Sequence, residues 1–128
     1  MKMLTKAIRK AMPELYANEP DDSTTVDPQV ICKFFTPWAG WTWYALEASA
    51  VVRDEVDGAE YGPVADHEGK DVVFWGWVCG HEEELGYFRL SELEGIRGPA
   101  GLRIERDMYF VSRPLSEVQE RHHRMGAA

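Results

Sequence analysis

The chain has 128 residues and a mass of 14.6 kDa, which suits one domain with one modest core and excludes two independently folded units. Its net charge of −8 argues against generic binding to a phosphate backbone, so we predict no affinity for duplex DNA at physiological salt. No run of about 18 apolar residues is present, and no apolar stretch follows the basic N-terminal residues, so neither a membrane span nor a secretory signal is expected. Two cysteines cannot build a disulfide framework, which favours a reduced, cytoplasmic protein.

The first predicted element is a short helix near the N-terminus. Thr5 is a candidate N-cap, and Leu4, Ile8 and Met12 recur at helical spacing on one face. Pro13 ends the helix within two turns. The following residues, 17–28, have the composition of an irregular loop.

Aromatic and β-branched residues then predict a sheet. We predict a hairpin of Val30–Thr36 and Trp41–Ala48, a central strand over Asp71–Cys79, and a short strand around Leu85–Phe88. Gly76, inside the central strand, indicates either a ring lying flat over the backbone or a bulge.

Alternation along the predicted strands assigns their side chains to faces. One face of the first strand is expected to carry Val30, Cys32 and Phe34, and one face of the central strand Val73, Trp75 and Trp77. The rings expected to be largely buried are Phe34, Trp43 and Phe74.

Helix signals in the second half are weaker. Ser91 and Glu94 have the spacing of a capping box, and Gly95 limits that helix to about one turn. Pro114 can open a last helix through Arg121, which Leu115 and Val118 alone would hold. These elements predict an α+β fold, a small mostly antiparallel sheet with short flanking helices. We expect residues 1–121 to form the single domain, 53–70 to form a loop, and 122–128 to form a frayed tail.

The acidic residues are concentrated in the middle of the chain. Residues 14–84 hold 16 acidic side chains against three basic ones. Two interpretations remain open, a set of solvated loops and a negative surface that meets a basic protein partner. For the second interpretation, the best candidate patch is Glu82, Glu83 and Glu84 at a hairpin tip.

The tryptophans permit three interpretations. Most rings are explained by core packing, but Trp38 and Trp41 lie in or beside a turn, where an exposed ring would be a hot spot for a partner. A stacking platform for single-stranded nucleic acid needs interleaved basic residues, and this region offers only Lys33.

No catalytic motif or phosphate loop is present, and no catalytic residue is assigned. Glu47 lies among apolar neighbours and is either partly buried or, as we expect, directed to solvent on the polar side. Residues 105–107 are expected to form an ion-paired structural anchor. Alternatively, Arg97, Arg103 and Arg106 would line a small anion site.

A metal site is not predicted, and neither is a cofactor. Cys79 and His81 could both bind one metal ion, but the site would need a third ligand. The candidate for that ligand is Cys32, which lies inside a predicted strand and would have to lie beside Cys79. Two buried thiols that pack as small hydrophobic groups are the better interpretation. His122 and His123 are expected to face solvent in the tail.

Two blocks of the sequence are specific, Phe34-Phe35-Thr36-Pro37-Trp38 and Leu85-Gly86-Tyr87-Phe88. With them, the chain resembles over roughly residues 3–118 a small bacterial family of unknown function, whose members are often encoded on plasmids and other mobile elements. The resemblance brings no catalytic residues. It implies a bacterial cytoplasm and a gene that travels with mobile DNA.

Together these observations favour an accessory interaction protein of a mobile element over an enzyme. In its most specific form, an acidic face would mimic DNA and occupy a basic groove on a host defence or DNA-processing protein. The alternative is a small-ligand binder or enzyme with a Trp-walled pocket and an arginine anion anchor. A mimic needs its acids in one contiguous ridge, whereas a pocket protein needs a concave site with converging polar groups.

Overall fold

The computed structural model describes residues 2–18 and 26–125. Its strands are β1 (Gln29–Val30), β2 (Cys32–Phe35), β3 (Thr42–Glu55), β4 (Gly58–Gly62), β5 (Val72–Cys79), β6 (Glu83–Arg89), β7 (Glu105–Arg106) and β8 (Arg113–Pro114). Its helices are α1 (Lys6–Ala11), α2 (Leu90–Gly95) and α3 (Leu115–Met125), with short 3-10 turns η1 (Val64–Asp66) and η2 (Pro99–Gly101).

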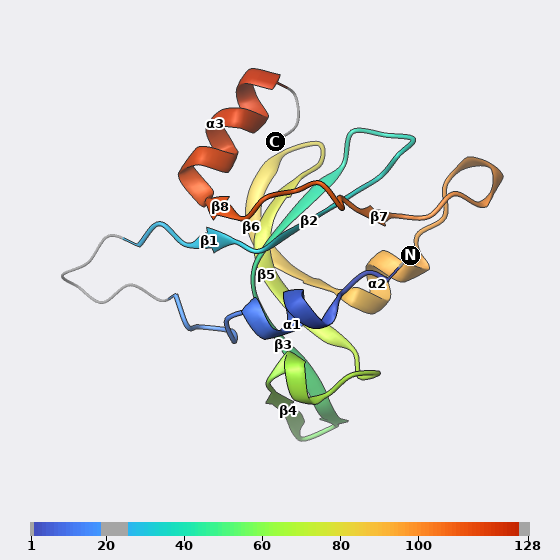
Figure 1. The fold of residues 1–128 in the computed structure, drawn as a ribbon. Helices are drawn as coiled ribbons and strands as arrows, with labels where there is room; N and C mark the ends of the chain where they lie inside the picture. The colour runs from blue at the N-terminus through green and yellow to red at the C-terminus, as the bar shows by residue number, and fades with distance from the viewer. Residues whose placement is uncertain (1, 19–25, 126–128) are drawn as a thin grey trace.

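One antiparallel sheet organises the molecule (Figure 1), in the order β6-β5-β3-β2-β7, with β4 also paired to β3. β1 and β8 form a separate two-stranded sheet. The long strand β3 is the centre, because it pairs with β2, β4 and β5. The predicted hairpin and the internal position of the strand at 71–79 are therefore confirmed, as is the α+β class.

The sheet buries side chains on both faces. We call the face covered by α1 and α2 the α2 face and the face covered by α3 the α3 face. The α2 face buries a cluster that includes Cys32, Phe34, Trp43, Phe74, Phe88 and Leu93. The α3 face buries a second cluster of Val30, Tyr44, Leu46, Trp77, Cys79, Leu115 and Val118. The three rings expected to be buried are buried.

Two expectations about the strands are wrong. Val30 does not share a face with Cys32 and Phe34, because the chain breaks from β1 to β2 at Ile31 and places Val30 in the α3-face cluster. Residues 53–70 are not all loop, since β3 continues to Glu55 and turns through Gly58 into β4. Gly58 has a φ of 138°, a conformation that suits glycine in a tight turn.

The helices begin where side chains satisfy their first backbone N–H groups. Thr5 caps α1 as predicted, because its Oγ1 accepts the Ile8 N–H at 3.1 Å. Ser91 does not cap α2. The helix begins one residue earlier, and Asp71 accepts both the N–H and the hydroxyl of Ser91.

The last helix differs most from expectation. Asp27 binds Ser116 at the start of α3 in the same way, through the backbone N–H at 3.0 Å and the hydroxyl at 2.5 Å. The helix then continues to Met125, beyond His122, where we expected fraying to begin. His122 is held because its Nδ1 lies 2.9 Å from the buried hydroxyl of Tyr44. Within the described ranges, no helix combines the length and apolar character needed to cross a membrane.

Candidate functional site

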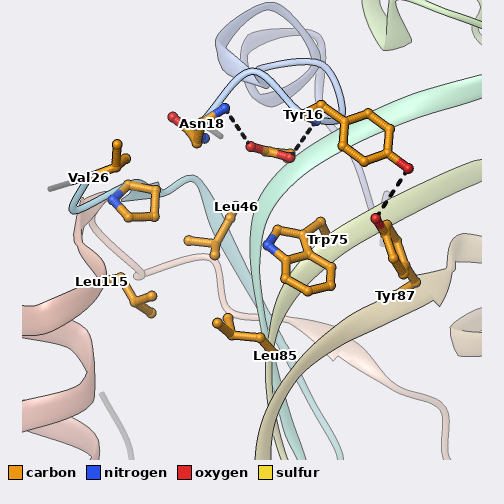
Figure 2. Close-up of a pocket in the computed structure, with 10 residues that line it drawn as sticks. Tyr16, Asn18, Val26, Leu46, Trp75, Leu85, Tyr87 and Leu115 are labelled. Carbon is orange, nitrogen blue, oxygen red and sulfur yellow. Dashed lines mark hydrogen bonds between the residues drawn. The ribbon is translucent and has the colours of Figure 1, made fainter. Parts of the chain in front are cut away.

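An apolar pocket of about 410 Å³ opens on the α3 face of the sheet. Figure 2 shows its wall, in which side chains of β3, β5 and β6 face the start of α3. The lining residues are Tyr16, Asn18, Val26, Pro28, Leu46, Glu47, Trp75, Leu85, Tyr87 and Leu115. A concave apolar site with a few polar groups is the usual form of a ligand site.

A β-bulge aims Glu47, the only carboxylate among the described residues of this lining. The register of β3 against β5 runs from Ala45 opposite Gly76 to Glu47 opposite Trp75, so Leu46 is an extra residue. The bulge turns both Leu46 and Glu47 toward the α3 face, whereas Ala45 and Ala48 pack in the α2-face core. Strict alternation would have placed Glu47 in that core.

Gly76 makes this irregular pairing possible. A Cβ on Gly76 would overlap the Tyr44 carbonyl oxygen and approach the Ala45 Cα to 3.2 Å. The sequence indicated a ring or a bulge at this glycine. The bulge is confirmed, and it is the backbone of β3, not a ring, that lies against Gly76.

Glu47 is buried, with an exposed fraction of 4%, so the expectation that it faces solvent is wrong. One carboxylate oxygen accepts the Tyr16 N–H and the other accepts the Asn18 N–H, each at 2.8 Å. Within residues 2–18 and 26–125, no Lys, Arg or His side chain forms an ion pair with it. Burial of a carboxylate is costly unless hydrogen bonds and charge compensate it. Here two backbone groups compensate it in part, and room remains on its oxygens for further donors.

Aromatic side chains form the wall beside Glu47. On the sheet face, Glu47, Trp75 and Tyr87 are cross-strand neighbours on β3, β5 and β6. The rings of Trp75 and Tyr87 lie 4.8 Å apart, and the Tyr87 hydroxyl donates to the Tyr16 hydroxyl at 3.3 Å. The buried side-chain Nδ2 of Asn18 has no hydrogen-bond partner within the described part of the chain. The pocket thus offers an aromatic face, a buried acceptor and a buried donor.

The two tryptophans predicted as hot spots lie outside this pocket. Both are half-buried and pack against the α2-face core. The Trp38 ring covers Gly98 and the Trp41 ring covers Gly80, so closely that neither glycine could carry a Cβ. Their contacts are those of packed rings, which leaves only part of each ring available to a partner.

Two of the three arginines of the anion hypothesis are neighbours, because Arg97 and Arg103 pair across an isolated antiparallel bridge, but only Arg103 is among the residues that line a hollow there. Arg97 donates to the carbonyl oxygens of Glu94 and Ile96, and Arg106 donates to the Lys2 carbonyl oxygen. Arg103 lines a second hollow of about 870 Å³, which has equal numbers of basic and acidic side chains: Lys2, Arg9 and Arg103, and Glu68, Glu94 and Glu105. The anchor at 105–107 is present instead, because β7 pairs with β2 and Asp107 lies 3.5 Å from the buried Lys33 ammonium.

The three consecutive glutamates do not sit together on a hairpin tip. Only Glu82 lies in the turn, whereas Glu83 and Glu84 are the first residues of β6 and point to opposite faces. Glu83 pairs with His123 of α3 at 2.6 Å. Neither His122 nor His123 is therefore a free tail residue.

The cysteines lie on opposite faces of the sheet, Cys32 on the α2 face and Cys79 on the α3 face, so they cannot share a metal with His81. Both are buried free thiols, and burial raises the pKa of each to about 12, with the charge of Glu83 adding to the effect at Cys79. Such thiols pack as apolar groups and resist ionisation.

Comparison with known families gives one match. Residues 65–127, just under half of the chain, match the model of a family described as a protein of unknown function, DUF2958. No curated protein and no solved structure gave a significant match. The matched half supplies Trp75, Leu85, Tyr87 and Leu115 to the pocket, whereas Glu47 and Asn18 come from the other half.

Proposed function

We propose that the protein is an interaction protein, not an enzyme, which captures a positively charged partner by taking a lysine or arginine side chain into the α3-face pocket. The observation that carries the proposal is Glu47, a buried carboxylate in the lining of an apolar pocket. It accepts two backbone N–H groups, and no cationic side chain of the described residues forms an ion pair with it. A basic side chain would supply the missing positive charge.

The pocket wall suits the rest of such a side chain. Lysine and arginine carry an apolar stem, which Leu46 and Leu115 would contact, and a cationic head, which the Trp75 ring attracts. Hydrogen bonds between a cation and a carboxylate are about twice as strong as neutral ones. The Asn18 Nδ2 would meet a carbonyl oxygen of the same partner. The net charge of −8 would speed the encounter with a basic protein.

A DNA-mimicking ridge has less support from the geometry. The acidic cluster on β3 and β4 and the one at the start of β6 lie at opposite ends of the sheet (Figure 1). Ion pairs also neutralise several members, since Arg53 contacts Glu55 and Glu60, and Arg89 contacts Asp54.

The setting of this interaction is part of the same proposal. The sequence resemblance supports a gene carried by a plasmid or another mobile element and a partner met in the bacterial cytoplasm. A host defence protein or a DNA-processing protein with a basic surface fits that setting.

The experiment is an NMR titration with two probes that share a four-carbon side chain and differ by the terminal ammonium group, Nα-acetyl-lysine amide and Nα-acetyl-norleucine amide. We expect the lysine probe to shift the Trp75 indole N–H and the Tyr16 amide resonances, and to bind at least about tenfold more tightly, the effect of about 1.4 kcal/mol from the charged contact. The affinities of an arginine-rich peptide and of free pentylammonium are then compared. Tighter binding of the peptide indicates a protein partner, and tighter binding of pentylammonium indicates a small organic amine.

Glu47→Gln tests the acceptor, and Glu92→Gln, on the exposed side of α2, is the control with the same charge change. The first variant should lose the preference for lysine over norleucine, and the control should keep it. Glu47→Gln also removes one of the bonds from Tyr16 and Asn18, because an amide NH2 group cannot accept an N–H. Trp75→Leu therefore provides a second variant that leaves those bonds in place. Equal affinity for the two probes in the parent chain would refute the proposal.

A further inference from the structure

The outer edge of β6 has no partner strand among the described residues. β6 has seven residues and pairs with β5 over its whole length without a register shift. Among the described strands it has no neighbour on its other side. Its alternate N–H and C=O groups therefore point away from the sheet.

This edge carries few of the usual protections against strand addition. Natural edge strands are blunted by charged side chains, lysine above all, by proline, by a bulge, by very short length or by a covering segment. The charged side chains of β6 are of both signs, Glu83, Glu84 and Arg89, so they do not repel every strand that could pair with it. β6 contains no lysine, no proline and no bulge, and α2 folds back beneath the α2 face, where Leu90 and Leu93 are buried. Two of its side chains on the α3 face, Leu85 and Tyr87, are 48% and 55% exposed.

We propose that this edge pairs with the same edge of a second copy of the chain, antiparallel and with Gly86 opposite Gly86. The sequence of β6 is complementary to itself in this register. On the α3 face, Glu83 of one copy would face Arg89 of the other, and Leu85 would face Tyr87. A two-fold axis makes each of these pairs occur twice, as a closed dimer requires.

In the monomer, one carboxylate oxygen of Glu83, Oε2, already contacts His123, so the pair across the dimer would use its other oxygen. Arg89 contacts Asp54 and Asp71 through Nη1, and its side chain is 34% exposed, so the guanidinium group remains accessible to a partner strand. At the centre, a Cβ on Gly86 would meet nothing within 4 Å, so the backbones can approach there without a clash. Opposite charges and apolar pairs directly across two strands each stabilise the pairing.

The dimer would also extend the binding site of the proposed function. This consequence rests on the proposed function, whereas the dimer itself does not. Leu85 and Tyr87 line the pocket, so the partner strand would extend the pocket wall beyond β6. Two pockets would then lie on one continuous sheet face and could engage two basic side chains of one partner protein.

A charge exchange tests the register. In a Glu83→Arg chain the paired positions become Arg opposite Arg, and in an Arg89→Glu chain they become Glu opposite Glu. We expect each variant alone to be monomeric in sedimentation-velocity and light-scattering measurements at concentrations where the parent is dimeric. An equimolar mixture should dimerise, because every Arg then faces a Glu. Glu92→Arg is the control and should remain dimeric.

Leu85→Asp gives an independent test, because it places a carboxylate opposite Tyr87 and leaves both charged positions unchanged. It should also be monomeric. The proposal is overturned if the parent chain stays monomeric up to near-millimolar concentration, if the single variants dimerise like the parent, or if the mixture does not. A monomeric parent whose β6 amides become protected only with an added lysine-rich peptide would assign the edge to another protein. A parent chain that is monomeric but still binds the lysine probe would refute the dimer without contradicting the proposed function of the pocket.

Discussion

Replacement of Gly76 by alanine should destabilise the fold severely, whereas the same change at its cross-strand neighbour should not. Gly76 and Gly86 face each other on β5 and β6. A methyl group at Gly76 would overlap the Tyr44 carbonyl oxygen and crowd the Ala45 Cα, and both are backbone atoms of a central strand. At Gly86 the same methyl group meets open space. The two substitutions therefore compare the effect of the same added methyl group in a crowded site and in an open one.

The magnitude follows from what must move. An extra group in a packed region costs about 1–3 kcal/mol, and a backbone obstacle places Gly76→Ala at the upper end, about 3 kcal/mol. Against a typical total of about 5–15 kcal/mol, that is a large share of the stability. Gly86→Ala should gain about 0.5–1 kcal/mol, because alanine loses less backbone entropy than glycine in a strand.

Urea unfolding followed by tryptophan fluorescence gives both values, and the Tyr16 amide resonance reports the site. Gly76→Ala should shift that resonance, since β3 can relieve the clash only by moving the bulge that aims Glu47. Equal effects of the two substitutions, or an unchanged Tyr16 resonance in a destabilised Gly76→Ala chain, would refute this reasoning.

Four further outcomes are expected. Phe74→Ala should cost about 3–5 kcal/mol in urea unfolding, because the ring is fully buried between two others. Burial lowers the pKa of His122, and the positive charges of His123 and Lys33 add to this effect against the opposing charge of Glu83. The folded state therefore favours the neutral imidazole, and the stability that His122 contributes is complete above about pH 6.5 and falls as the pH drops through its folded pKa. Melting curves from pH 8 to 5 should show this loss, and His122→Phe should remove much of it. Cys32 should react with a thiol reagent at pH 8 only as fast as the protein unfolds, and rapid labelling of the folded chain would contradict its burial. Fluorescence anisotropy should detect no micromolar binding to duplex DNA at about 150 mM salt.

The strands that could be predicted from the sequence are those whose signal is local. The aromatic runs around Phe34 and Phe74 specify the hairpin and the strand at 71–79 without help from the rest of the chain. The β3–β4 hairpin was hidden by its acidic composition, although Asp57-Gly58 is a hairpin-turn dipeptide that could have identified it.

The candidate site was harder to predict, because it depends on residues far apart in the chain. Glu47 in an apolar strand is a local signal that it could be buried. Its actual direction depends on the bulge at Leu46 and on donors at Tyr16 and Asn18, about thirty residues earlier. The cap on α2 shows the same dependence, since the spacing of Ser91 and Glu94 indicated a local capping box but the acceptor is Asp71.

The Asp27 contact at the start of α3 bears on how this chain can be divided. The half that resembles a known family contains β5, β6 and α3, but β3, one of the two strands that pair with β5, and the carboxylate at the start of α3 both belong to the other half. We therefore expect the matched segment, expressed alone, to lack a stable fold, because it would lose both contacts. Recombination within this chain would have to keep Asp27 with Ser116 and β3 with β5, so a functional exchange must carry most of the gene as one block.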